Sequence, residues 1–202
     1  MNAPLTGPVV PPLLDDYQPR LLTIADLAEL PSELPSGTVR YELHHGRLII
    51  MPPPGDIHGA VENKFAGALL YQGEYAGHGK ARCGEVAIVL ARNPDHVLGA
   101  DAAFIGNDRL PIQRSPEGYL LTIPHLVVEV RSKNDTLAAL GRRAQDYLDA
   151  SVVVVWVVDP FNRNVLEHRQ DQPVITIDET GTLTAADVIP GFSLSVSAAL
   201  QE

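Results

Sequence analysis

The chain has 202 residues, of which 45% are hydrophobic and 20% are charged, and its formal net charge is −10 at pH 7. This length and composition predict a single domain with its own hydrophobic core. The negative charge argues against a broad basic face for non-specific nucleic-acid binding, because phosphate neutralisation requires clustered Lys and Arg. Any contact with DNA must therefore be local.

The sequence also bears on the cellular setting. No apolar stretch reaches the roughly 18 residues that span a bilayer, and the first residues lack the charged and apolar blocks of a signal peptide. We therefore expect a soluble, cytoplasmic protein with no membrane partner. The single cysteine, Cys83, excludes an internal disulfide and a thiolate zinc cage, and we expect it to be a buried thiol.

The first elements follow a proline-rich start. Residues 1–20 contain five prolines and little periodicity, which predicts a disordered tail ahead of a single domain at residues 21–202. Thr23 is the predicted N-cap of a short helix running to about Leu30. Asp26 supports this prediction, because it stands three residues after Thr23, in the acidic position of a capping box.

A hairpin and a long helix come next. Residues 39–43 and 48–51 are predicted strands, and Gly46 between them can supply the left-handed turn position. From residue 56 to about residue 71, apolar side chains recur every three to four positions, which predicts an amphipathic helix. These positions are Ile57, Val61, Phe65, Ala68 and Leu69.

The remaining elements predict an α/β fold with a mixed central β-sheet flanked by helices. A second helix is expected from Asn134 or Asp135 to about Ala150, with Asp135 as its cap. The most apolar run, residues 152–158, favours a central strand covered on both faces. Further strands are predicted at 82–90, 98–105, 125–131 and 164–168, with short strands after them.

Two acidic residues stand in apolar, strand-like surroundings. Glu129 lies within Leu126 to Ser132, and Asp101 lies between Val97 and Ile105. Burying an unpaired charge costs several kcal/mol, roughly, so such an acid needs a metal, a cationic partner or an opening to solvent. On neighbouring strands the two carboxylates could form a divalent-metal site. The alternative is an acid that is paired with Arg or exposed at the rim of the sheet.

Several short motifs, in this order, resemble the Uma-two family over about residues 21 to 198. That family belongs to the PD-(D/E)XK nuclease superfamily, whose members have a restriction-endonuclease-like fold and are described as endonucleases. The motifs are Tyr41-Glu42-Leu43, Gly46-Arg47-Leu48, His58, Asp101 to Ile105, Pro124 to Ser132, Tyr147-Leu148, Val155 to Pro160 and Pro190-Gly191-Phe192.

The resemblance implies that Asp101 and Glu129 are the motif acids, which hold Mg²⁺ or Mn²⁺ together with the carbonyl oxygen of Val130. Carboxylate and carbonyl oxygens suit such a hard cation, which retains positions for water and phosphate. A bound divalent ion lowers the pKa of its water and stabilises charge on a scissile phosphate. Both effects serve phosphodiester hydrolysis.

The chain departs from the family pattern at its basic residue. Arg131 occupies the lysine position of the Glu-x-Lys motif, and Arg143 occupies the helix position that commonly supplies a migrated lysine. Arginine can orient water and neutralise a phosphoryl oxygen, but it stays protonated and cannot act as a base. Lys133 is a further candidate for the basic role. Ala100 also replaces the usual proline before Asp101.

Three more residues are accessory candidates. Glu42 and Glu85 can each supply a third carboxylate, or they are surface acids at strand ends. His58 can hydrogen-bond an active-site acid or a phosphate, or it caps its helix locally. His44 and His45 form no ligand-spaced pair with another His or Cys, so we expect no zinc site.

These observations favour a metal-dependent endonuclease that hydrolyses DNA phosphodiester bonds. The arginines in the lysine positions and the acidic net charge favour an alternative, a catalytically impaired nuclease-fold protein that acts as a nucleic-acid-binding or assembly module. A third possibility, a metal-dependent hydrolase for a small phosphorylated substrate, needs no basic face. The sequence leaves the oligomeric state open, with a homodimer as one candidate.

Overall fold

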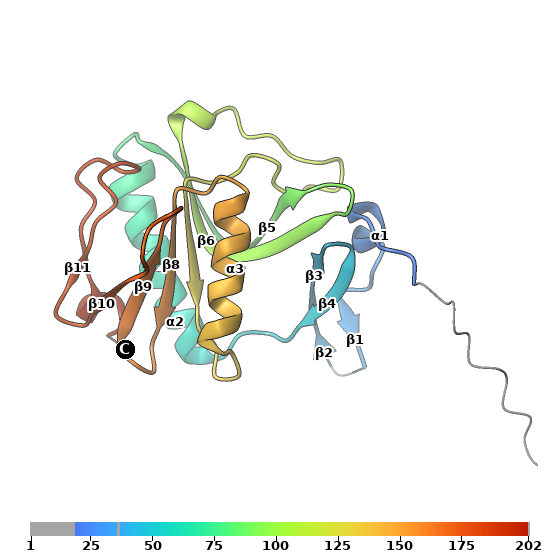
Figure 1. The fold of residues 1–202 in the computed structure, drawn as a ribbon, viewed down its shortest axis with the longest axis horizontal. Helices are drawn as coiled ribbons and strands as arrows, with labels where there is room; N and C mark the ends of the chain where they lie inside the picture. The colour runs from blue at the N-terminus through green and yellow to red at the C-terminus, as the bar shows by residue number, and fades with distance from the viewer. Residues whose placement is uncertain (1–18, 36, 202) are drawn as a thin grey trace, which may run out of the picture.

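A computed structural model describes residues 19–35 and 37–201 (Figure 1). Most of the predicted N-terminal tail lies outside the described residues. The helices are α1 (Ile24–Ala28), α2 (Asp56–Ala68), the π-helix η1 (Leu69–Glu74), the 3₁₀-helix η2 (Asn107–Arg109), α3 (Leu137–Asp149) and α4 (Val196–Ala199). The strands are β1 (Glu33–Leu34), β2 (Gly37–Thr38), β3 (Arg40–His44), β4 (Arg47–Met51), β5 (Gly79–Ala91), β6 (His96–Gly106), β7 (Leu126–Val130), β8 (Val154–Asp159), β9 (Asn164–His168), β10 (Ile175–Asp178), β11 (Thr182–Leu183) and β12 (Leu194–Ser195).

The central sheet is mixed, as predicted. Its strand order is β10-β9-β8-β7-β6-β3-β4, and β5 also pairs with β6. Strands β7 and β8 run parallel, whereas the other pairs described in this sheet are antiparallel. Every residue of β8 is buried between β7 and β9, which confirms the central strand predicted from its continuous apolar run.

One helix covers each face of the sheet (Figure 1). Val61 and Phe65 of α2 pack with Trp156 in one hydrophobic cluster. Leu140 and Tyr147 of α3 belong to a second cluster on the other face. The apolar spacing of the two helix sequences is what allows each to bury a single side against the sheet.

Strand β6 has an interrupted edge that positions the site described below. One edge pairs with β5 over nearly the whole strand, from Gly79↔Gly106 to Ala91↔His96. Because a strand has only two edges, β7 and β3 must share the other. Strand β7 pairs with residues 102–104 and β3 pairs at Val97, so residues 98–101 face a gap between them. Backbone groups there need partners from side chains.

Two local predictions were wrong. The N-cap of α3 is Thr136, whose side chain accepts a hydrogen bond from the Ala139 N–H, and not Asp135. Asp135 instead accepts a hydrogen bond from the Ser132 N–H at 2.8 Å, which closes the turn before the helix. Cys83 is exposed rather than buried, and it lies directly before the shift in register between β5 and β6.

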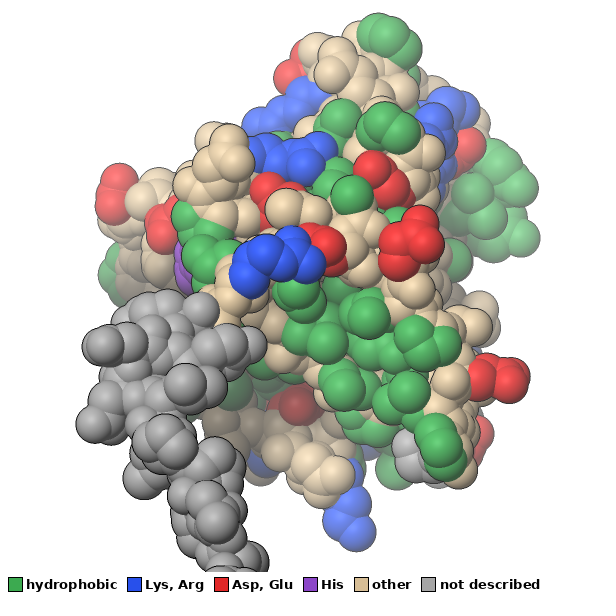
Figure 2. Space-filling view, turned by 90° about the vertical axis from the view of Figure 1, so that its right-hand side faces the viewer, with side chains coloured by type: hydrophobic (Ala, Val, Ile, Leu, Met, Phe, Trp, Pro, Cys, Tyr) green, Lys and Arg blue, Asp and Glu red, His purple; other side chains and the backbone are tan. Residues whose placement is uncertain are grey.

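The outer surface contains an apolar area at the β4 end of the sheet. Figure 2 shows hydrophobic side chains gathered on this side of the molecule, which carries α1 and the β3–β4 hairpin in Figure 1. On β4, the side chains of Ile49 and Ile50 are 36% and 50% exposed, and the side chain of Leu21, before α1, is 46% exposed. Among the described residues, no helix is both long enough and apolar enough to cross a membrane.

Candidate active site

Side chains from β3 and α3 fill the gap along β6. The Gly99 N–H donates to Oε1 of Glu42 at 2.7 Å, and the Gly99 carbonyl accepts from Nη2 of Arg143 at 2.5 Å. A Cβ at position 99 would lie 3.2 Å from Glu85 and 3.4 Å from Glu42. Glycine therefore gives two carboxylates room beside the strand, and the unpaired backbone groups gain polar partners.

Arg143 joins two acids of the gap. Its Nη1 and Nη2 donate to Glu42, and its Nε donates to Glu129, each at 2.7 Å. The Arg143 side chain is only 13% exposed. The arginine is therefore a buried cation between two carboxylates, at the helix position where the family resemblance implies a migrated basic residue.

Glu129 is held from a second side by Tyr147, whose hydroxyl donates to Oε1 at 2.7 Å. Burial is the largest influence on Glu129 and raises its pKa to about 8, although Arg143 opposes this shift. The nearby charge of Asp101 adds to the rise. Both oxygens of Glu129 thus already have hydrogen-bond donors within the protein.

Glu42 shows the opposite behaviour at similar burial. Burial alone would raise its pKa, but hydrogen bonds from His44 and Arg143 outweigh burial and hold the pKa at about 2. The His44 ring contributes Nε2 at 3.0 Å from Oε2 of Glu42. Glu42 therefore stays ionised and supplies the main counter-charge for Arg143.

Asp101 lies at the start of the β6–β7 pairing and turns toward α2. Its Oδ2 accepts the Val130 N–H at 2.6 Å and lies 3.2 Å from Nε2 of His58. Burial lowers the pKa of His58, but the charges of Asp101, Glu85 and Glu62 more than offset this, so the pKa is raised overall. His58 and Asp101 therefore form a buried pair that links α2 to the sheet.

Glu85 reaches the same place from a bulge in β5. Its φ is +58°, and the β5–β6 register shifts between Cys83 and Val86, which re-aims the side chain. Oε1 of Glu85 contacts Nη1 of Arg40 at 2.5 Å. Burial, and then repulsion from Asp101, raise the pKa of Glu85 to about 7 against the pull of Arg40.

The donor set at Asp101 fits a divalent cation. His58, Glu85 and Asp101 each offer a ligand atom, and these atoms lie within 4.8 Å of one another. Two carboxylates and an imidazole suit such an ion, which would also relieve the repulsion between Glu85 and Asp101. Glu129 is not in this group. The predicted pair of Asp101 and Glu129 thus lies in one region, with the two carboxylates bonded to different partners.

Arg131 and Lys133 lie outside this cluster of contacts. Arg131 donates from Nη1 to Asp159 at 2.8 Å and from Nε to the Asp135 carbonyl at 3.1 Å. Lys133 is exposed in the turn before α3. Of the three basic residues considered from the sequence, Arg143 is the one that directly contacts Glu42 and Glu129.

Sequence reasoning missed two contributors. Arg40 lies two positions before Glu42 on β3 and pairs with Glu85. Glu62 follows His58 by four helix positions, and its Oε2 lies 3.9 Å from Nδ1 of His58. The i, i+4 spacing was a usable signal, since it places two polar side chains on one helix face.

A second histidine group forms where no zinc site was expected. His45, His96 and Asp146 bring possible ligand atoms within 4.8 Å of one another. However, Nδ1 of His96 accepts the His45 N–H at 3.3 Å, which leaves the proton of a neutral ring on Nε2. That nitrogen lies 3.5 Å from Asp146. This geometry favours a His–Asp pair over a metal site.

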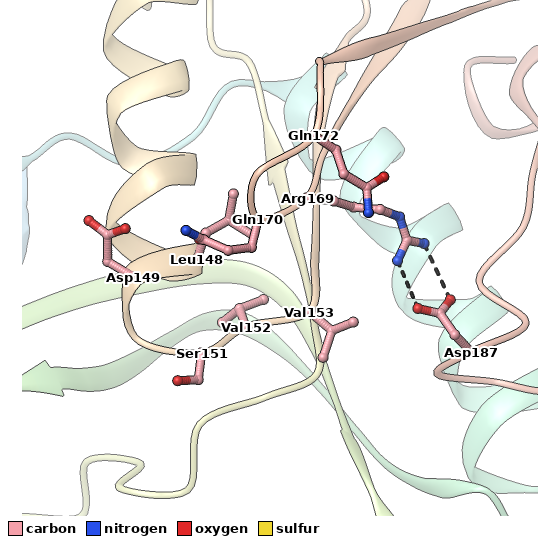
Figure 3. A pocket seen from close by; sticks show the side chains of 9 residues that line it. All are labelled: Leu148, Asp149, Ser151, Val152, Val153, Arg169, Gln170, Gln172 and Asp187. Carbon is pink, nitrogen blue, oxygen red and sulfur yellow. Dashed lines mark hydrogen bonds and ion pairs between the residues drawn. The ribbon is translucent and has the colours of Figure 1, made fainter.

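A pocket of about 800 Å³ lies elsewhere, beyond the end of α3 (Figure 3). Arg169 and Asp187 form an ion pair across it, with Nη1 and Oδ2 2.7 Å apart. The pocket is not lined by any of the acids, the histidine or the arginine described above: Glu42, His58, Glu85, Asp101, Glu129 and Arg143. The cluster of ionisable side chains therefore lies at the β6 gap and not in this cavity.

A comparison with solved structures shows what fold this chain has. The crystal structure of a putative nuclease belonging to DUF820 from Anabaena variabilis matches with a TM-score of 0.72 and 18% sequence identity, covering 89% of this chain and 99% of that chain. At this identity the match establishes the fold, a mixed α/β architecture shared with a nuclease-like protein.

The particular family follows from the sequence. The family model Uma2, described as "Putative restriction endonuclease", matches residues 25–197. The chain belongs to this family, which confirms the resemblance to Uma-two. A comparison with curated proteins finds no match.

Proposed function

We propose that this protein is a metal-dependent endonuclease that hydrolyses DNA phosphodiester bonds at the β6 gap, with Asp101 and Glu129 as its PD-(D/E)XK acids. The supporting observation is that six candidate residues meet there, each from a different element. They are Glu42, His58, Glu85, Asp101, Glu129 and Arg143. Family membership supports a nuclease, and the acids support the use of a metal.

Asp101 is the proposed anchor for Mg²⁺ or Mn²⁺, with Glu129 and the Val130 carbonyl as the family-implied further ligands. The ion, when bound, supplies a water of lowered pKa and charge stabilisation at the phosphate. The chain itself positions these groups: the Val130 N–H holds the Asp101 carboxylate, and Tyr147 and Arg143 hold Glu129. Arg143 takes the basic role in place of lysine.

Cleavage of supercoiled plasmid with Mg²⁺ or Mn²⁺ tests this proposal. Wild type should nick or linearise the plasmid, and Asp101→Ala, which removes the anchor, should not. Exposed Asp149 on α3 offers a matched acid outside the site, so Asp149→Ala should cleave as wild type does. Equal cleavage by wild type and Asp101→Ala would reveal a contaminating nuclease or a different site.

One observation favours the second candidate, an impaired nuclease that acts as a nucleic-acid-binding or assembly module. The guanidinium of Arg143 donates to Glu42, to Glu129 and to the Gly99 carbonyl, so all three of its nitrogens are engaged within the protein. A cation committed in this way is poorly placed to assist a phosphate.

Arg143→Lys distinguishes the two candidates, because lysine can lose its proton and makes fewer fixed contacts. Plasmid cleavage well above wild type would identify the natural protein as impaired. Cleavage by wild type that is lost in an Arg143→Ala variant shown to be folded by circular dichroism would identify arginine as the working basic residue. The single domain at residues 21–202 and the cytoplasmic location stay predictions.

A further inference from the structure

The possible ligand set of His58, Glu85 and Asp101 differs chemically from an all-oxygen magnesium site. His58 supplies an imidazole from α2, while Glu85 and Asp101 supply carboxylates from β5 and β6. The side chains of His58 and Asp101 are only 7% and 5% exposed. The imidazole therefore points into a buried acidic site rather than into solvent.

The backbone arrangement keeps these groups together. Glu85 is aimed inward by the β5 bulge, and Asp101 is fixed by the Val130 N–H at 2.6 Å. His58 lies near the start of α2, three residues after its N-cap, Gly55. Each donor thus belongs to a regular element or a defined bulge, which favours a preorganised site.

His58 also has a suitable outer partner. Its Nδ1 is buried and has no hydrogen-bond partner among the described residues. Glu62 lies beside it, with Oε2 3.9 Å from that nitrogen, and Oε1 of Glu62 accepts the Gly84 N–H at 2.9 Å. A metal-binding histidine usually donates its other ring N–H to a carboxylate, and this pair lies within a small movement of that arrangement.

Glu129 is already paired within the protein. Both of its oxygens accept hydrogen bonds, one from Arg143 and one from Tyr147, each at 2.7 Å. The cation that balances Glu129 is therefore already part of the protein. Among the described residues, Glu85 contacts Arg40 and Asp101 contacts His58.

We propose that His58, Glu85 and Asp101 form a centre for a divalent first-row transition metal, with Glu62 orienting His58, and that this centre prefers Mn²⁺ to Mg²⁺. The inference rests on the proposed nuclease function in one respect: the ion bound here is the metal ion of that proposed site. Imidazole suits transition metals, whereas Mg²⁺ prefers oxygen ligands and near-ideal octahedral geometry. The nitrogen ligand therefore decides the selectivity.

Binding of Mn²⁺ to the full chain, without DNA, tests the proposal by titration calorimetry and electron paramagnetic resonance. We expect Mn²⁺ to bind at least tenfold more tightly than Mg²⁺, and bound Mn²⁺ to show magnetic coupling to an imidazole nitrogen. His58→Gln should remove the coupling and most of the preference. Glu62→Gln should weaken Mn²⁺ binding by about 10- to 100-fold while the coupling remains.

Two controls keep the outcome clear. Asp149→Asn, at an exposed acid of α3 outside the proposed ligands, should retain the nitrogen coupling, and circular dichroism should show that every variant is folded. Equal affinity for the two ions, bound Mn²⁺ without nitrogen coupling, or coupling that survives His58→Gln would each overturn the inference. Coupling without plasmid cleavage would support the centre while removing the nuclease proposal, and cleavage without coupling would do the reverse.

Discussion

Arg143 shows how a single side chain can hold a site together. It is a cation with 13% exposure between Glu42 and Glu129, which lie on separate strands of the sheet. Removing one partner from a buried ion pair leaves an uncompensated charge, and this costs more than the pair itself contributes. Arg143 therefore has a structural role that is separate from any part in hydrolysis.

Arg143→Met should lower the free energy of unfolding by about 3–5 kcal/mol, because Glu42 loses its principal counter-charge inside the protein. Urea denaturation followed by circular dichroism measures the change. Glu42→Gln in the same chain should recover part of the loss, since the uncompensated carboxylate is gone. The neighbouring Arg142 is exposed, so Arg142→Met should change stability by less than about 0.5 kcal/mol. A similar loss in both variants would contradict the buried-pair account.

Asp159, which lies outside the candidate site, should make the stability of the folded protein depend on pH. Burial acts to raise its pKa, but hydrogen bonds from Asn162 and Arg131 outweigh burial and lower the pKa below its ordinary value of 3.8. A carboxyl group with a lowered pKa stabilises the folded state above its unfolded pKa, and this stability is lost as the pH falls through the folded pKa. Asp159 should therefore contribute fully at pH 7 and progressively less below about pH 4.

Asp159→Asn keeps the shape and removes the charge, so it should cost about 1–3 kcal/mol at pH 7. The difference from wild type should shrink when unfolding is measured at pH 3. Asp171→Asn, at an exposed position, is the matched control and should show little difference at either pH. A penalty for Asp159→Asn that is as large at pH 3 as at pH 7 would show that its ionisation is not involved.

At the scale of elements, the cap of α3 gives a direct test. Thr136 accepts the Ala139 N–H through its side-chain oxygen at 3.2 Å. Thr136→Ala should lower stability by about 1 kcal/mol, whereas Thr136→Ser, which keeps the hydroxyl, should cost less. Thermal unfolding compares the three proteins. If Thr136→Ser loses as much as Thr136→Ala, then the methyl group and not the capping bond is responsible.

Local signals explain which elements the sequence could predict. The capping box of Thr23 and Asp26 lies within one turn, and the apolar run of β8 reflects burial on both faces, so both were predictable. The cap of α3 was missed by one residue because Asp135 and Thr136 are both good caps. Only the structure shows that Asp135 closes the preceding turn.

The arrangement of the site could be predicted only in part. An acid within an apolar strand signals a special environment, and Asp101 and Glu129 were identified in this way. Their partners could not be found from spacing, because the Arg143–Glu42 contact depends on how β3 and β7 share one edge of β6. Likewise, the inward direction of Glu85 depends on a β-bulge that no local pattern announces.

The whole molecule presents one surface suited to self-association, and the homodimer stays a prediction. Strand β4 ends the central sheet and exposes Ile49 and Ile50, and an edge strand has unpaired backbone groups. Light scattering should give twice the chain mass of 21.8 kDa. Ile50→Lys should then shift the protein toward monomer. Ile57→Lys, at an exposed position of α2, should not. A monomeric wild type would contradict the expectation.

The long sequence separation between Arg143 and Glu42 has a consequence for the folding kinetics. These residues are 101 positions apart, and closing so long a loop is costly before the contacts it permits are made. We expect the contact to form after the transition state for folding. Stopped-flow measurements on Arg143→Met should therefore show faster unfolding with a nearly unchanged refolding rate. The Arg143–Glu42 contact would therefore slow unfolding, and so lengthen the lifetime of the folded protein, without changing the rate of folding.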